Sequence, residues 1–196
     1  MKRPDIELIH HIMKEAGMVV FDKPFDVTLG GIRTKDNSSN AFNDWIFASL
    51  FTKEGIMSTV FEGTTDAGRY YRENPINPNG TAIIEHGVQH RGCYTYMATG
   101  GHKGQEAFRQ TGGMSYWRDN DKDAILEFDG TKYEDKIFNT NGHDMGESGE
   151  AVNKWSAGCW GSVKRNMDIL YMMAQLQMKN DLGDKFSYAM LHEDMF

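Results

Sequence analysis

The chain has 196 residues, which is long enough to bury a sizeable core and fits a single domain. Its content of 39% hydrophobic and 25% charged residues is ordinary for a folded protein and excludes a disordered one. The formal net charge of −7 argues against nucleic acid and anionic membranes as partners, and the basic residues form no run that could follow a phosphate backbone.

The apolar segments are short. The longest of them, such as Met18 to Phe21, fall far below the roughly 20 residues that cross a bilayer, so no membrane span is predicted. The first 17 residues contain neither a continuous apolar stretch nor a small-residue cleavage site, so we expect no secretory signal and synthesis in a cytoplasm. Two cysteines do not make a disulfide framework.

The first elements predict a helix followed by a β-rich core. Between Asp5 and Gly17 the apolar residues recur at helical spacing. From 18 to 162, short apolar runs alternate with turn residues, which is typical of strands. The predicted strand segments are MVVF (18–21), DVTLGGIRT (26–34), DWIFASLF (44–51), IMSTVFEG (56–63), TAIIEHG (81–87), CYTYMAT (93–99), MSYWRD (114–119) and AILEF (124–128).

The last elements are a helix and a strand. Residues 163–180 gather their apolar side chains on one helical face, and residues 185–193 alternate as a final strand. We therefore expect residues 1–196 to form a single, mainly β domain with a sandwich or barrel-like core and two helices. An inserted loop region at about 92–130 is larger than such a core needs, and we interpret it as a lid or a substrate wall.

One cysteine, Cys159, stands between two glycines and two tryptophans in the segment KWSAGCWGS (154–162). A cysteine nucleophile needs a base that takes its proton and donors that bind the developing oxyanion. Gly158 allows a tight backbone turn that could aim N–H groups at the oxyanion, and His143 is the nearest upstream base. A buried core thiol is the alternative interpretation, because free cysteine is among the most buried residue types.

These residues carry a resemblance to a known family. A glycine-flanked His143, a loop and then Ser156-x-Gly158-Cys159 resembles the active-site signature of the L,D-transpeptidase (YkuD-like) catalytic domain. Upstream, VFEGTTDAG and NPINPNGTAII are similar to the strand, glycine turn, proline loop and Gly-Thr strand of that family. The resemblance covers residues 57–160, and it implies an L,D-transpeptidase-like β core and action on peptidoglycan stem peptides through an acyl-enzyme.

The resemblance also implies roles for individual residues. Cys159 would be the nucleophile, His143 the general base and acid, and the backbone around Gly158 the oxyanion hole. Ser156 would orient the histidine or shape the loop, although a turn-capping serine is the alternative. The expected substrate contacts are Thr81 on the Gly-Thr strand, Arg118, and Trp155 and Trp160 as a stacking wall, for which core packing is the alternative.

The chain departs from the family at two positions. Ala157 stands where a second histidine is common, and Gly161 stands where an arginine commonly helps to hold a substrate carboxylate. The remaining arginines that could replace it are Arg91, Arg118 and Arg165. No cofactor and no metal are predicted, because His86, His90, Cys93 and His102 lack the spacing of a zinc site and the acidic segment 119–130 lacks the glycine and glutamate of a calcium loop. The alternative interpretation is that Cys93 is a strand residue and that these histidines line the outer edge of a cleft.

The absence of a predicted secretory signal favours a phage-type lysis enzyme, or endolysin, that is made in the host cytoplasm and released to the cell wall. The sequence thus predicts a cysteine hydrolase that cuts peptidoglycan stem peptides and so contributes to bacteriolysis. Three alternatives stay open: an L,D-transpeptidase that cross-links peptidoglycan, a non-catalytic wall-binding module, and a cysteine hydrolase of cytoplasmic amides. The sequence does not specify an oligomeric state.

Overall fold

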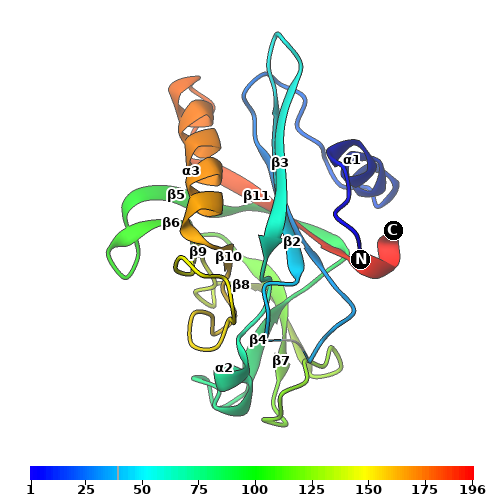
Figure 1. The fold of residues 1–196 in the computed structure, drawn as a ribbon, viewed down its shortest axis with the longest axis vertical. Helices are drawn as coiled ribbons and strands as arrows, with labels where there is room; N and C mark the ends of the chain where they lie inside the picture. The colour runs from blue at the N-terminus through cyan, green and yellow to red at the C-terminus, as the bar shows by residue number, and fades with distance from the viewer. Residues whose placement is uncertain (39) are drawn as a thin grey trace.

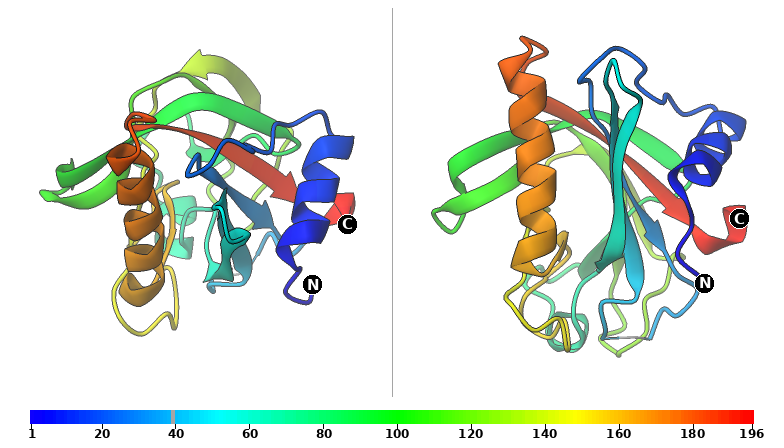
Figure 2. Two further views of the ribbon diagram at one scale, coloured as in Figure 1. Left: turned by 90° about the horizontal axis from the view of Figure 1, so that it is seen from above. Right: turned by 45° about the horizontal axis from the view of Figure 1, so that its top comes forward.

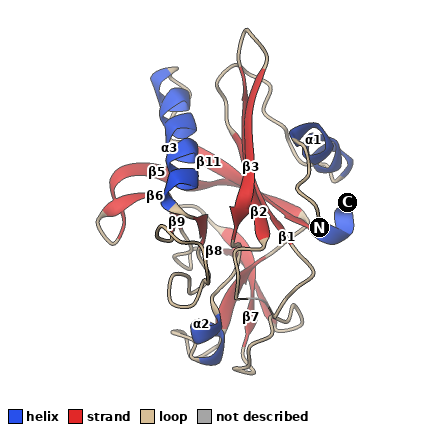
Figure 3. Cartoon of the chain, viewed as in Figure 1, coloured by secondary structure: helices blue, strands red, loops and turns tan. Residues whose placement is uncertain are grey.

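The computed structural model describes residues 1–38 and 40–196, and it is mainly β with helices at the periphery (Figures 1 and 3). In chain order the elements are α1 (Ile6–Glu15), β1 (Thr28–Arg33), β2 (Asp44–Phe51), β3 (Ile56–Gly63), α2 (Arg69–Glu73), β4 (Thr81–Ile84), β5 (Val88–His102), β6 (Gln105–Gln110), β7 (Met114–Asp119), β8 (Thr131–Lys136), β9 (Gly142–Asp144), β10 (Trp160–Ser162), α3 (Lys164–Lys179), β11 (Lys185–His192) and the 3-10 turn η1 (Glu193–Met195).

Eight strands form one strongly curved sheet that nearly closes into a barrel (Figure 2). Their order is β10-β9-β6-β5-β11-β1-β2-β3, so that β10 and β3 are the two ends. The ends meet where Thr64, directly after β3, exchanges two backbone hydrogen bonds with Gly161 of β10, at 2.8 and 2.9 Å. A second sheet of three strands, β4-β7-β8, lies below the barrel in the view of Figure 1.

The curved sheet is covered on both faces. One face packs against α3, whose buried residues join a cluster with alternate side chains of β2 such as Ile46 and Ala48. The other face packs against α1, where Ile9 and Met13 meet Phe47 of the same strand. Burial on both faces explains why DWIFASLF reads as a continuous apolar run instead of an alternating one.

A buried ion pair anchors the turn that follows β3. The Arg33 guanidinium donates to both carboxylate oxygens of Asp66 at 2.7 to 3.0 Å, and both groups are almost fully buried. Beside it, the Asp44 carboxylate accepts from the backbone and the hydroxyl of Thr65, each at 2.8 Å. Charge-assisted hydrogen bonds of this kind fix the Thr-Thr-Asp turn. Gly68, at the end of this turn, donates to the carbonyl of Ser156 at 3.0 Å, so the turn supports the cysteine loop.

Some of the predicted helices and strands are found in the structure, and two predicted strands are not. The helices at 5–17 and 163–180 are found as α1 and α3, and Ile56–Gly63 forms β3 over the predicted span. The predictions of strands at 18–21 and 124–128 are wrong, since neither segment forms regular structure. Within the described residues, no helix is long and apolar enough to cross a bilayer.

Candidate functional site

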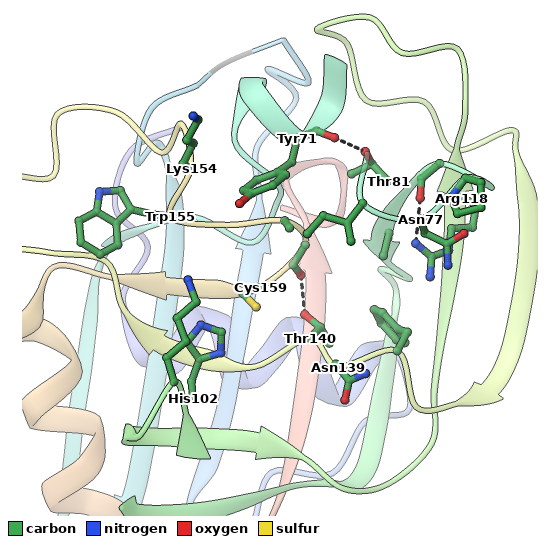
Figure 4. A pocket seen from close by; sticks show the side chains of 18 residues that line it. Tyr71, Asn77, Thr81, His102, Arg118, Asn139, Thr140, Lys154, Trp155 and Cys159 are labelled. Atoms are coloured by element: carbon green, nitrogen blue, oxygen red, sulfur yellow. Dashed lines mark hydrogen bonds between the residues drawn. The ribbon is translucent and has the colours of Figure 1, made fainter. Parts of the chain in front are cut away.

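A pocket of about 490 Å³ opens between the curved sheet and the three-stranded sheet, with Cys159 on its wall (Figure 4). The 71–82 segment, the turn between β5 and β6, residues 138–140 and the cysteine loop 154–159 line it. Three cationic side chains face it, namely Lys103, Arg118 and Lys154, and no Asp or Glu is found among the described residues that line it. The pocket therefore favours a ligand that carries negative charge.

Cys159 lies at the entrance to β10 with its side chain directed into the pocket (Figure 4), although only 8% of the residue is exposed. The backbone N–H of Asn141 donates to its Sγ at 3.4 Å. The hydroxyl of Thr140 donates to the carbonyl of Gly158, which ties the cysteine loop to the segment before β9. Cys159 is thus held by the neighbouring chain segment and remains open to the pocket on one side.

His143 lies on β9, the parallel neighbour of β10, and is opposite Gly161 in the register. Its Nδ1 is 2.6 Å from the carbonyl oxygen of Asp144, so Nδ1 carries the proton and Nε2 has a free lone pair. Nε2 is buried and has no hydrogen-bond partner among the described residues. Ring nitrogens of His143 and His102 and the Sγ of Cys159 all lie within 4.8 Å of one another.

Ser156 acts on the cysteine loop and not on the histidine. Its hydroxyl donates to the Cys159 carbonyl at 2.7 Å and accepts from the Gly158 N–H at 3.1 Å, and the side chain is fully buried. The prediction that Ser156 either orients His143 or shapes the loop is therefore resolved in favour of the loop. Because the Gly158 N–H is engaged by Ser156, the Cys159 N–H is the stronger candidate for an oxyanion donor.

Gly158 has the backbone conformation that its position in the loop demands. Its φ of +123° is one that side chains with a Cβ rarely adopt, and a Cβ would also lie 3.0 Å from the carbonyl oxygen of Ala82. Only glycine therefore allows the cysteine loop to pass this close to β4. That close approach places the cysteine beside the Gly-Thr strand that lines the pocket.

His102 is the residue of this site that the sequence did not identify. Its ring stacks on that of His143 with 4.1 Å between centroids and 3° between planes. The side-chain nitrogen of Asn141 lies 3.2 Å from His102 Nδ1. The sequence offers His102 as a fourth zinc ligand beside His86, His90 and Cys93 or as one of several histidines along the edge of a cleft, and neither interpretation places it on His143. A histidine next to the Lys-Gly turn of GGHKGQ was the available signal, but nothing in the sequence linked it to His143.

Burial keeps both members of the pair neutral. It raises the pKa of the Cys159 thiol to about 11, against the smaller opposing effects of the Asn141 N–H and of Lys103. It lowers the pKa of His143 to about 4, with a further contribution from His102. The resting site near pH 7 thus contains a thiol and a neutral imidazole instead of an ion pair.

The expected substrate contacts separate into two groups. Thr81, Arg118 and Trp155 line the pocket, and Trp155 is 49% exposed. The prediction that Trp160 binds substrate is wrong, because this residue is fully buried in the core, where its ring stacks on Tyr188 at 4.8 Å. Alternation along β10 explains the difference, since successive side chains of a strand point to opposite faces.

Arg118 is the arginine that reaches the pocket. Its Nη1 donates to the Gly80 carbonyl at 2.8 Å and its guanidinium lies over the ring of Tyr116. Arg91 instead lies over Phe21, and Arg165 is exposed on α3. The inserted region 92–130 therefore contributes a pocket wall through His102, Lys103 and Arg118, while its strands belong to both sheets.

The two histidines and the cysteine are the donor set that zinc prefers. Because the two rings are parallel and stacked, their nitrogen lone pairs point along parallel planes and do not converge on one ion. His102 Nδ1 is also engaged by Asn141, and Lys103 adds positive charge beside the site. The arrangement therefore suits proton transfer better than metal binding. Cys93, by contrast, is fully buried and donates to the carbonyl of His90.

Comparison with known proteins adds no relative: no protein-family model matches the chain, and no curated protein and no solved structure matches it significantly.

Proposed function

We propose that the protein is a cysteine hydrolase of the L,D-transpeptidase type that cuts peptidoglycan stem peptides through an acyl-enzyme on Cys159. The observation that carries the proposal is the buried Nε2 of His143, which has no partner among the described residues, together with a ring nitrogen of His143 that lies within 4.8 Å of the pocket-facing thiol of Cys159. Burying an imidazole nitrogen without a hydrogen-bond partner costs folding free energy, and a role as the base that takes the proton of a neighbouring thiol explains why such a nitrogen is present.

The reaction follows from the two neutral groups. The Sγ of Cys159 attacks the carbonyl carbon of the peptide bond while Nε2 of His143 takes the thiol proton, so charge develops only as the bond forms. The oxyanion is met by the Cys159 N–H. Collapse breaks the C–N bond, and His143 returns the proton to the leaving amine. A water molecule then attacks the thioester, gives a proton to His143, and releases the carboxylic acid and the thiol.

The charge of the pocket supports an anionic peptide as substrate. Arg118, Lys103 and Lys154 line the pocket into which the thiol opens, no Asp or Glu belongs to its described lining, and Trp155 adds a flat apolar surface. Peptides with free carboxylates fit this lining. In this proposal Arg118 holds the substrate carboxylate, which in the family is commonly the role of an arginine at the position of Gly161. Release to the wall after synthesis in the cytoplasm, as in phage lysis, is part of the same proposal.

Trapping the acyl-enzyme tests the proposal. Purified stem peptides are mixed with the wild-type chain, the reaction is quenched in acid, and intact-mass and peptide analysis locate any added acyl group. We expect the acyl mass on Cys159, absent in Cys159→Ala and in His143→Gln. Absence of any adduct and of any product with wild-type protein would contradict the proposal.

Two alternatives give different outcomes in the same experiment. An L,D-transpeptidase would transfer the acyl group to an added amino acid amine faster than to water, so the product mass decides between cross-linking and hydrolysis. A non-catalytic wall-binding module would form no adduct, yet Cys159→Ala would still sediment with insoluble cell wall.

A further inference from the structure

A second imidazole lies directly on the proposed base. The rings of His102 and His143 are 3° from parallel with 4.1 Å between centroids, and they come from different elements, the end of β5 and the middle of β9. His143 is 3% exposed, whereas His102 is half-buried and lines the pocket. The ring of His102 therefore forms the cover that separates the buried base from the pocket.

His102 is itself held in place from two sides. Asn141 Nδ2 lies 3.2 Å from its Nδ1, and Asn141 Oδ1 accepts from the Gln110 N–H at 2.9 Å, which fixes the orientation of the amide. The backbone N–H of the same Asn141 donates to the Sγ of Cys159. A two-residue turn at Lys103 and Gly104, with φ values of +48° and +84°, ends the strand directly after His102. One asparagine thus connects the thiol with the second imidazole.

Among the described residues, a single hydrogen bond holds the His143 ring, so a second contact adds to its support. The hydrogen bond from Nδ1 to the Asp144 carbonyl fixes one edge of the His143 ring and does not by itself fix the tilt of the ring about that bond. A flat neighbour at stacking distance opposes such a tilt, and aromatic stacking of this kind is favourable beyond the area it buries. Without it, Nε2 could turn away from the thiol and water could reach it.

We propose that His102 is a positioning residue, whose stacked ring keeps Nε2 of His143 aimed at the thiol of Cys159 and shields it from water. The inference rests on the proposed function of the Cys159–His143 pair. It assigns His102 no proton transfer, since its Nδ1 is engaged by Asn141 and the stacked faces offer no path for a proton.

The test uses a small acyl donor, so that it does not depend on peptidoglycan. The full chain is mixed with p-nitrophenyl acetate, and the burst of nitrophenolate gives the acylation rate of Cys159 between pH 5 and 9. We expect His102→Ala to lower this rate at pH 7 by about tenfold and to shift its pH profile, because small misplacements of a base cost this much or more. His102→Phe keeps a flat ring and should stay within about threefold of wild type.

Two further variants separate positioning from a general structural effect. His102→Gln keeps an acceptor for Asn141 but has no ring, so its acylation rate should resemble that of His102→Ala. If the alanine variant does not fold, the comparison of His102→Gln with His102→Phe tests the same point. His192→Ala removes another half-buried histidine that stacks on a histidine, His86, at 4.7 Å and away from the pocket, and should leave acylation unchanged. Equal rates and pH profiles in wild type, His102→Ala and His102→Gln would overturn the proposal.

A proton titration by NMR gives the second readout. In the wild type the pKa of His143 lies at about 4, with Asp144 and Lys103 as the other charged neighbours. Both variants remove the charge of His102, which itself lowers the pKa of His143, but only His102→Ala also removes the covering ring, so the midpoint should move further toward the ordinary value in His102→Ala than in His102→Phe. Equal midpoints in the two variants would contradict the shielding. If the wild type gives no burst with the ester, the cysteine mechanism fails, but the titration still decides the role of His102.

Discussion

Gly161 is predicted to be intolerant of any side chain, so an arginine does not fit at this position. A Cβ at this position would lie 2.0 Å from the carbonyl oxygen of His143 and 3.1 Å from the Met145 methyl group. The carbonyl belongs to the paired strand β9, so it cannot rotate away. Strand β10 would have to shift, and the two hydrogen bonds between Gly161 and Thr64 that close the barrel would be lost.

The size of the effect follows from those two bonds. Each buried backbone group left without a partner costs about 1–3 kcal/mol, so Gly161→Ala should lower the free energy of unfolding by about 3–5 kcal/mol. For a chain of this length, 1 kcal/mol shifts Tm by about 2–4 °C, which predicts a drop of about 6–20 °C.

Thermal unfolding followed by circular dichroism measures this loss. Gly87→Ala is the matched control, because a Cβ there meets open space and only the φ of +78° resists it, at about 1–2 kcal/mol. A Gly161→Ala variant whose Tm lies no lower than that of Gly87→Ala would refute the reasoning about the closed barrel.

Three other predictions concern stability and substrate binding. His86 accepts a hydrogen bond from Arg33 at 3.1 Å, and burial lowers its pKa to about 4, so the folded state keeps the imidazole neutral. Its contribution to the free energy of unfolding is complete above pH 6.5 and is lost as the pH falls toward 4. The loss is about 2 kcal/mol after allowance for the partial exposure of the ring. His86→Gln should therefore lose less stability than wild type between pH 7 and pH 4.5 in urea titrations, and parallel curves would contradict this. Ser156→Ala leaves the Cys159 carbonyl and the Gly158 N–H without their partner, and should lower the free energy of unfolding by about 2 kcal/mol in the same assay. A change near zero would contradict this prediction. Arg118→Met should raise KM for an anionic stem peptide about tenfold and leave acylation by neutral p-nitrophenyl acetate unchanged; equal effects on both would argue against a carboxylate contact.

The parts of the site that are near in sequence could be predicted. Cys159, Gly158 and Ser156 form one loop, and the glycine-flanked His143 precedes it by a short segment. The resemblance of this pattern to the L,D-transpeptidase signature, and not the spacing alone, predicted that the histidine and the cysteine act together. His102 could not be found in this way, because it reaches His143 only through the pairing of β5 with β6 and of β6 with β9. Contacts made by strand pairing join residues that are far apart in the sequence, so no local sequence pattern predicts them.

The errors in the fold have similar physical causes. The apolar run at 18–21 was too short to distinguish a strand from a buried connection, and β8 was missed because the strand TKYEDK is almost entirely exposed and polar. The position of Trp160 beside the nucleophile predicts a substrate wall. Because side chains alternate between the two faces of a strand, its ring instead points into the core, where it packs between Tyr188 and Phe108.

The most direct test of the central claim is mass spectrometry of the soluble fragments that wild-type protein and Cys159→Ala release from purified peptidoglycan. The account predicts that wild type alone releases or trims stem peptides, with fragment masses that identify the cleaved bond. Walls of several chemotypes left unchanged by the wild type, or changed equally by Cys159→Ala, would contradict a cysteine hydrolase of the cell wall.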